Sequence, residues 1–268
     1  MIKNTTNTSS LPLGEMSEGQ SGLYNYILGI ADNSLILGQR LGELCGHGPS
    51  LETDIACTNI SLDLFGQTRN YYQYAAQIKG GNTTEDDIAF LRKEHEYLNV
   101  LLVEQLNTDF AYVMARQFLF DAYHLLFLRE LQKSHDVTLS AIANKAVKEV
   151  GYHYRFSSDW IKRLGDGTEE SHQRTQNAID DLWTYTNELF HQTDTDKSMI
   201  QEGIGVDTLK LKEEYYKRVS EILQKATLQI PESKWFQKGG KEGIHTEHLG
   251  FLLADLQYMQ RTYPNMEW

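Results

Sequence analysis

Acidic residues and histidines recur along the chain at spacings that could build a carboxylate-bridged di-iron centre. Such a centre takes one carboxylate from each of two helices and a Glu-x-x-His pair from each of two others, because residues i and i+3 project to the same side of a helix. In chain order, this gives an acid, an acid-x-x-His pair, an acid and a second pair. The chemistry would be that of an oxidase. The candidate ligands are Asp32, Asp63, Asp121, Glu149, His124 and His153.

Two positions of this pattern carry residues that cannot bind a metal. The residue three positions after Asp63 is Gly66, which has no ligating atom. The residue three positions before His153 is Val150, and Glu149 is one position too far back. At least two of six ligands are missing, so the sequence predicts a degenerate site that holds no metal. The degenerate positions are Asp32, Asp63, Gly66, Asp121, Val150 and His153.

The polar residues that remain also fit purely structural roles. Asp121 and His124 form an acid-x-x-His pair, but on a helix that should supply a single acid. Buried aspartates need charged or hydrogen-bonding partners, and histidines on apolar helices are commonly core residues held by hydrogen bonds. The basic residues that could pair with the aspartates are Arg40, Arg69 and Lys148.

Two short clusters near the C-terminal end could also bind a ligand, but their sequence patterns are less specific. His245, Glu247 and His248 could bind a metal from one helical turn, but adjacent residues of a helix diverge in direction. Lys238 and Lys241 flank two glycines and could contact an anion. No phosphate-binding loop pattern accompanies these lysines, so we expect a surface loop there.

Long helices must position all these side chains, and the apolar residues follow the helical period. Leucines, isoleucines and aromatic residues recur at three- and four-residue steps between glycines and prolines. Ser50 is placed to cap the second helix, and Gly80 to end it. No alternating pattern long enough for a strand occurs. The predicted helices span about 23–45, 51–78, 109–133, 141–164, 168–189, 207–227 and 245–263, and a less regular segment with a helix start covers 84–106.

The sequence therefore predicts an all-α fold, a four-helix bundle with additional C-terminal helices. A polar linker is expected at 191–206. Residues 1–22 have little apolar surface to offset the entropy of ordering, which predicts a flexible N-terminal tail. Residues 23–268 are predicted to form a single domain, because a chain of this length can fill one hydrophobic core.

Composition limits the classes of function. The chain has 268 residues, 40% of them hydrophobic, only 4 prolines and a formal net charge of -12. This net negative charge repels the phosphates of nucleic acids, which argues against nucleic-acid binding. No apolar run reaches the about 18 residues of a membrane span, and no signal-peptide pattern occurs, so we expect a cytoplasmic protein. Cys45 and Cys57 are too few for a disulfide framework and are predicted to be buried.

Several sequence blocks, in order from about residue 23 to the C-terminus, point to a known family. Together they resemble the C subunit of bacterial ring-1,2-phenylacetyl-CoA epoxidases, and they are far more specific than any single short motif. The blocks include QRLGE at 39–43, CGH at 45–47, DLFGQ at 63–67, LLVEQ at 101–105, DAYH at 121–124, YH at 152–153, GGK at 239–241 and HTEHLG at 245–250.

This resemblance implies a ferritin-like fold and a part in aerobic phenylacetate catabolism. In that family, the di-iron site lies in the A subunit, and the C subunit, a structural relative, pairs with it without performing the oxidation. The complex epoxidises the ring of phenylacetyl-CoA with dioxygen and with electrons from a reductase subunit that uses NADPH. The resemblance therefore implies no cofactor in this chain and a hetero-oligomer with the catalytic A subunit.

The resemblance also implies that the C subunit helps to hold the CoA part of the substrate at the boundary between the two subunits. The Asn99 amide could pair with an adenine edge. Each matching segment could instead be an ordinary surface turn. The matching residues are Glu96, Tyr97, Leu98 and Asn99 in one segment, and Lys197, Ser198 and Met199 in the other.

Three hypotheses remain open from the sequence. The first is a non-catalytic structural subunit that stabilises its di-iron partner. The second is a self-sufficient di-iron oxidase that uses the six candidate ligands. The third is a metal-free, ferritin-like homo-oligomer that acts as a scaffold. Iron content, and molecular size with and without the catalytic subunit, distinguish them.

Overall fold

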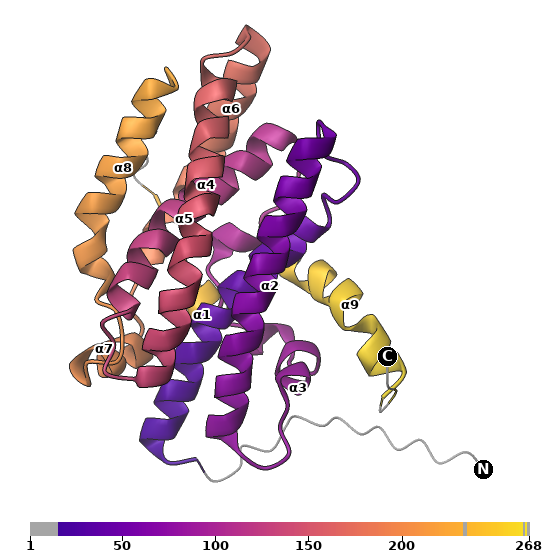
Figure 1. Ribbon diagram of the computed structural model, residues 1–268, viewed down its shortest axis with the longest axis vertical. Helices are drawn as coiled ribbons and strands as arrows, with labels where there is room; N and C mark the ends of the chain where they lie inside the picture. The colour runs from indigo at the N-terminus through magenta and orange to yellow at the C-terminus, as the bar shows by residue number, and fades with distance from the viewer. Residues whose placement is uncertain (1–15, 233–234, 265, 267–268) are drawn as a thin grey trace.

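The computed structural model describes residues 16–232, 235–264 and 266, and every regular element within them is helical (Figure 1). The all-α prediction is confirmed. The α-helices are α1 (Glu18–Gly42), α2 (Leu51–Lys79), α3 (Glu85–Phe90), α4 (Phe110–Leu131), α5 (Val137–Gly165), α6 (Glu169–Leu182), α7 (Asp194–Gln201), α8 (Lys212–Lys225) and α9 (Glu247–Thr262). The 3-10 helices are η1 (Glu94–Glu96), η2 (Leu101–Glu104), η3 (Trp183–Phe190), η4 (Thr208–Leu211) and η5 (Gly240–Glu242).

Four long helices form the centre of the fold. α1 packs along α2, α4 packs along α5, and contacts between α2 and α5 join the two pairs. α4 is the most enclosed, with 18 of its 22 residues buried. α6 and α8 pack on α4 and α5, α7 packs on α1, and α9 lies on the other side of the bundle beside α3 (Figure 1). This ferritin-like bundle with additional C-terminal helices positions the candidate residues.

Polar caps determine where the helices begin and end. Ser50 accepts a hydrogen bond from the Thr53 N–H at the start of α2, and Gly80 ends that helix with a φ of 70°. Asp109 and Asp136 cap α4 and α5 with their carboxylates. These side chains satisfy N–H groups that have no partner inside a helix. The predictions for Ser50 and Gly80 are confirmed.

The first helix begins earlier than predicted. Ser17 and Gln20 form a capping box, in which each side chain bonds the main chain of the other residue, and α1 starts between them. Residues 18–22, predicted to be part of the tail, are therefore helical. Residues 1–15 of that predicted tail lie outside the described residues.

The irregular parts of the chain also differ from the prediction. The predicted linker at 191–206 contains α7, because Thr193 caps the helix in another capping box. The segment 84–106, predicted to be less regular, consists of the three short helices α3, η1 and η2. α5 starts at Val137, four residues before the predicted boundary, directly after the Asp136 cap. Long helices were thus predicted better than the segments that connect them.

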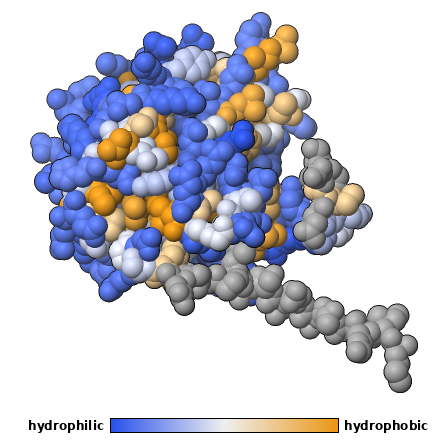
Figure 2. All heavy atoms as spheres, turned by 60° about the horizontal axis from the view of Figure 1, so that its bottom comes forward, coloured by the Kyte–Doolittle hydropathy of each residue, from blue (hydrophilic) through white to orange (hydrophobic). Residues whose placement is uncertain are grey.

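The face of the molecule in Figure 2 is mainly hydrophilic. Figure 2 shows one face of the molecule, where hydrophobic residues gather in patches between hydrophilic ones. No described helix is both long and apolar enough to cross a membrane. Cys57 is buried as predicted, but the prediction for Cys45 is wrong, because this residue follows α1 in an exposed turn.

Candidate functional site

Asp32, the first candidate ligand, is fully buried on α1 and bound to Arg92. The two terminal nitrogens of the guanidinium lie 2.5 and 3.0 Å from the two carboxylate oxygens. The Tyr72 hydroxyl, at 2.5 Å, and the Leu98 N–H, at 2.8 Å, also donate to them. Four donors therefore satisfy this carboxylate, and the protein itself supplies the positive charge that a metal would otherwise provide.

The basic partners predicted for the aspartates are wrong. Arg40 pairs with a glutamate three residues later, and Arg69 lies 3.6 Å from Glu85. Lys148 is exposed on α5. Arg92 was missed because it lies in the irregular segment after α3, where no periodicity shows which side chains turn inward. Its only sequence signal is a basic residue next to an apolar stretch.

Asp63 and His153 join α2 to α5. The Nε2 atom of His153 lies 3.0 Å from the Asp63 carboxylate. His153 is fully buried, whereas the Asp63 side chain is 39% exposed, so the pair lies at the outer edge of the bundle. One turn away, the Gln67 amide donates to Glu149 at 3.0 Å. Both acidic candidates of these two helices are thus used in contacts between neighbouring helices.

Asp121 is fully buried on the central helix α4. The Gln117 amide, at 2.7 Å, and the Ser157 hydroxyl, at 2.8 Å, donate to its two oxygens. Burial raises the pKa of Asp121 to about 7, because the ionised carboxylate loses its water. Burial likewise lowers the pKa of His124 to about 3, so its imidazole is neutral at pH 7. Asp121, Gln117 and Ser157 form a hydrogen-bonded group in the core, whereas the buried Nδ1 of His124 has no hydrogen-bond partner within the described residues.

These residues do not fit a di-iron centre. Gly66 is exposed on the outer side of α2, and no described atom lies within 4 Å of the place where a Cβ would be. Even a histidine there would face away from the core, and Val150 is buried and apolar. Five of the six candidate ligands, all except His124, have hydrogen-bond partners within the fold. Within the described residues, no three Asp, Glu, His or Cys side chains are grouped closely enough to hold a metal ion.

The cluster predicted near the start of α9 has a structural role. His245 contacts the buried Glu104 carboxylate at 3.3 Å and the Tyr97 carbonyl at 2.8 Å. Burial lowers the pKa of His245, but the Glu104 carboxylate outweighs this effect and the net pKa is raised. Glu247 is exposed and His248 is half-buried. His245 therefore ties the loop before α9 to η2 instead of facing its two neighbours.

The two segments predicted to contact substrate lie along the same face of α1. The Leu98 carbonyl is 3.7 Å from the place where a Cβ on Gly29 would be. The Met199 side chain is 3.3 Å from the corresponding place on Gly22. Gly22 and Gly29 are two helical turns apart, or about 10 Å. The fold thus places both segments beside one helix.

The seven predicted contact residues differ in their access to solvent. Tyr97 donates to the Ala89 carbonyl at 2.5 Å, and the Asn99 amide donates to the Val100 carbonyl at 3.2 Å. The buried residues are Tyr97, Asn99 and Met199, the half-buried ones are Glu96 and Leu98, and the exposed ones are Lys197 and Ser198. A ligand that approaches from solvent therefore meets Lys197 and Ser198 first.

Lys197 lines a pocket of about 390 Å³ that is rich in lysine. Lys212 and Lys238 also line it, together with the rings of Phe190 and Phe236. The Lys212 ammonium lies 5.9 Å from the centre of the Phe190 ring. The Lys197 ammonium lies 2.9 Å from the exposed Asp194 carboxylate, and Glu188 also lines the pocket. Three lysines and two rings in one pocket suit a ligand with anionic and flat aromatic parts. Lys238 was predicted as an anion contact, whereas Lys212 was missed because no motif surrounds it.

Lys241, the other predicted anion contact, is engaged within the fold. Its ammonium lies 2.9 Å from the Asp196 carboxylate and 2.7 Å from the His191 carbonyl. Both side chains of the pair are largely buried, at 14% and 13% exposure. Lys241 therefore holds α7 to the C-terminal loop, and the prediction that it faces an anion is wrong.

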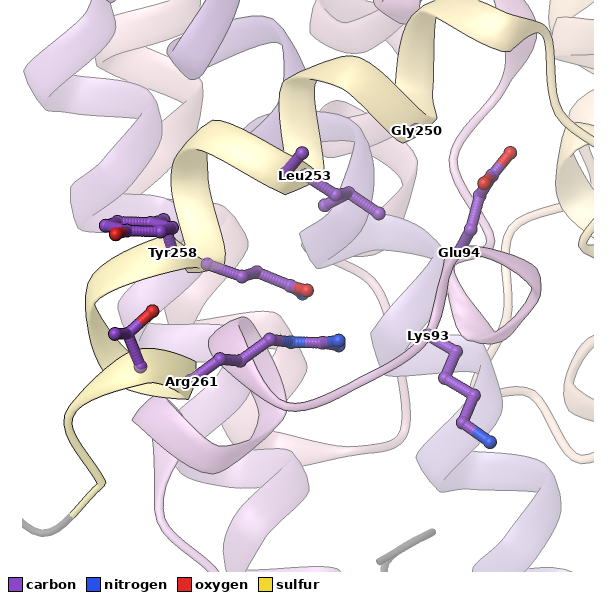
Figure 3. Close-up of a pocket in the computed structure, with 9 residues that line it drawn as sticks. Lys93, Glu94, Gly250, Leu253, Tyr258 and Arg261 are labelled. Carbon is purple, nitrogen blue, oxygen red and sulfur yellow. The ribbon is translucent and has the colours of Figure 1, made fainter. Parts of the chain in front are cut away.

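A pocket of about 370 Å³ lies between α9 and the start of η1 (Figure 3). Arg261 reaches across it from α9, but its guanidinium donates to the carbonyls of Leu91 and Arg92, at 3.4 and 2.8 Å. Lys93 and Glu94 bring opposite charges to the same pocket. Because its arginine is used by the main chain, this pocket offers less positive charge than the lysine-rich one.

The fold defines the class of protein, a ferritin-like bundle, and the aspartates Asp32, Asp63 and Asp121 in it are held by contacts to neighbouring side chains. A family model described as phenylacetic acid catabolic protein matches residues 14–268, and the chain belongs to this family. The chain is 47% identical over 243 residues to the C subunit of the 1,2-phenylacetyl-CoA epoxidase of Escherichia coli (strain K12). The match covers 91% of this chain and 98% of that protein. The resemblance found in the sequence blocks is confirmed.

Proposed function

We propose that this chain is the non-catalytic structural subunit of a multicomponent phenylacetyl-CoA epoxidase, acting in the cytoplasm in aerobic phenylacetate catabolism. It pairs with and stabilises the di-iron A subunit, while a reductase that uses NADPH supplies electrons to that partner. The observation that carries this proposal is the Asp32 carboxylate, which is satisfied by Arg92 and two further residues. A metal would have to displace a buried guanidinium to bind there.

The proposal includes a part in substrate binding. The CoA moiety carries phosphate groups and an adenine ring, so it needs cations and flat apolar surfaces. The pocket lined by Lys197, Lys212 and Lys238 offers both, within a chain of formal net charge -12. The neighbouring segment Glu96–Asn99 runs beside α1, next to the same region of the fold. We therefore place the CoA part of the substrate near Lys197.

The experiment is purification of this chain alone and with the catalytic subunit. We expect the chain alone to bind less than 0.1 iron per molecule, as an order of magnitude, and to show no epoxidase activity. With the catalytic subunit, we expect a stable complex of at least a heterodimer at micromolar concentration. Iron analysis and light scattering after size-exclusion chromatography provide the measurements.

The same experiment separates the other two hypotheses. Two irons per chain, with activity of the isolated chain, would support a self-sufficient di-iron oxidase. A homo-oligomer whose size does not change when the catalytic subunit is added would support the hypothesis of a metal-free scaffold. Either result contradicts the proposal.

A further inference from the structure

α2 and α5 form a face of the bundle whose outer side carries exposed apolar residues. The contacts Asp63–His153 and Gln67–Glu149 hold the two helices side by side and antiparallel. On α2, three large apolar residues recur at steps of four and seven, so they lie along one side of the helix. The exposed apolar residues are Leu51, Ile55 and Leu62 on α2, and Tyr152 on α5. We call these two helix surfaces the α2–α5 face.

The charge of this face differs from that of the rest of the chain. α5 carries five basic residues against the two acidic residues Glu149 and Asp159, a net charge of +3. α2 carries three acidic and two basic residues, a net charge of -1, so the two helices together carry +2. The whole chain has a net charge of -12, so the remainder carries -14. Arg155 lies over the Tyr152 ring at 5.8 Å. The basic residues are Lys145, Lys148, Arg155, Lys162 and Arg163. A partner that fits here presents acidic side chains.

The face has the size and composition of a specific protein interface. Each helix has 29 residues, which gives a length of about 43 Å at 1.5 Å per residue. Two such helices, each about 10 Å wide, cover roughly 870 Å². A standard interface buries about 800 Å² on each partner and is enriched in tyrosine and arginine. The area alone therefore suits one protein partner.

Two glycines leave room at the middle of this face. Gly66 on α2 and Gly151 on α5 have no described atom within 4 Å of the place where a Cβ would be. Both interrupt long helices, where glycine is less favourable than alanine. The side-chain contacts on either side place the two glycines at the same height along the antiparallel pair. A side chain of a partner helix could enter there between Leu62 and Tyr152.

We propose that the α2–α5 face docks an acidic helical surface of the catalytic subunit, with Leu62 and Tyr152 at its centre. This inference rests on the proposed function, because that function supplies the partner. The basic residues of α5 surround the apolar centre and steer an acidic surface toward it. α9 also exposes aromatic residues, Phe251 and Tyr258, but it is a single helix with a smaller face.

The test uses calorimetry and surface plasmon resonance to measure how tightly this chain binds the purified catalytic subunit. Leu62→Glu and Tyr152→Glu each place a negative charge at the centre of the face, and both sites are exposed, so folding should be retained. We expect each to weaken binding at least 30-fold. The controls, Leu209→Glu and Phe251→Glu, alter apolar residues elsewhere that are 57% and 72% exposed, against 60% for Leu62 and 41% for Tyr152, and should change affinity less than threefold.

A second arm tests the charge argument. Lys148→Glu combined with Arg155→Glu should slow association about tenfold at low salt, and should flatten its salt dependence. Circular dichroism of every variant checks that the fold is kept.

Each remaining outcome contradicts some part of the proposal. Wild-type affinity in both central variants would overturn the docking face while leaving the proposed function intact. Loss of binding with Phe251→Glu alone would move the interface to α9. Self-association of the isolated chain that disappears in the central variants would make a second copy the occupant. Complete failure of the wild-type chain to bind the catalytic subunit would refute the proposed function itself.

Discussion

The imidazole of His153 lies 3.0 Å from the carboxylate of Asp63, and this contact joins α5 to α2 at the edge of the bundle. Both residues were candidate ligands for a metal. The contact uses Nε2 of His153, while Nδ1 has no hydrogen-bond partner within the described part of the chain. Histidine and aspartate are residue types that can bind iron, but in this protein the two side chains hold α2 and α5 together.

The Asp32–Arg92 pair should be the most sensitive polar contact of the fold. Arg92→Met leaves the Asp32 carboxylate buried without its cation, which typically costs about 3–5 kcal/mol. We expect the free energy of unfolding, measured by urea titration, to fall by that amount. In the double variant Asp32→Asn with Arg92→Met, no buried charge remains, and a large part of the loss should be recovered.

The Asp63–His153 pair provides the matched control. The Asp63 side chain is 39% exposed, so water already solvates its charge in the folded state, and an asparagine there can still contact the buried His153. Asp63→Asn should therefore cost less than about 1 kcal/mol. An equal loss in Arg92→Met and Asp63→Asn would contradict the assignment of Asp32 and Arg92 as the central buried pair.

Asp121 should make the stability of the protein depend on pH. Its pKa is raised to about 7 in the folded state by burial, against about 3.9 in an unfolded chain. The folded state therefore binds the proton more tightly, and stability falls as the pH rises between about 4 and 7. Asp121→Asn cannot ionise; its amide oxygen can accept from Gln117, and its NH2 group can donate to the Ser157 oxygen in place of the bond that Ser157 now donates. We expect this variant to be more stable than the wild type at pH 8, by a few kcal/mol.

The comparison at pH 4 completes this test. There the wild-type side chain is protonated in the folded state, so Asp121→Asn should have little effect on the free energy of unfolding. Denaturant titrations of the wild type and of Asp121→Asn at pH 4 and pH 8 give the four free energies of unfolding. A gain of the same size at both pH values would mean that the effect does not come from ionisation of Asp121.

The long helices and their caps could be predicted because their signals are local. Ser50 precedes an apolar periodic stretch and Gly80 follows it, and both ends of α2 are where these residues place them. The partner of Asp32 could not be predicted, because Arg92 is 60 residues away in an irregular segment. α7 was missed since its eight residues are mostly polar, and only a capping box at Thr193 marks its start.

The sequence predicts a degenerate metal site because two ligand positions carry Gly66 and Val150. It does not predict whether the side chains at the candidate positions face the core or the solvent. Asp63 and Gly66 are three positions apart and therefore lie on the same side of α2. The sequence does not show whether that side faces the core. Gly66 is exposed, so this side faces outward. Packing against α5, which involves residues 90 positions away, decides the rotation of the helix.

Restoring a missing ligand should not restore iron binding. Gly66→His places an imidazole on the outer side of α2, and Val150→Glu places a carboxylate in an apolar position. Asp32 stays bound to Arg92 in both variants. We expect each variant to contain as little iron as the wild type after expression in iron-rich medium, by elemental analysis. Val150→Glu should also be destabilised, because it buries an unpaired charge. Two irons per chain in either variant would contradict the structural interpretation of the core.

The lysine-rich pocket should affect the Michaelis constant for phenylacetyl-CoA in the assembled epoxidase. Lys197→Ala and Lys212→Ala each remove one cation that could face a phosphate, and an exposed charge pair is worth up to about 1 kcal/mol. We expect KM to rise about fivefold for each single variant and more for the double variant, with kcat unchanged, because CoA is remote from the reacting ring. Lys210→Ala is the control, since this lysine is 82% exposed outside the pocket and pairs with Asp207. A fall in kcat at constant KM would show that these lysines act on assembly or catalysis and not on CoA binding. If Lys210→Ala raises KM equally, the effect comes from the overall charge of the chain and not from this pocket.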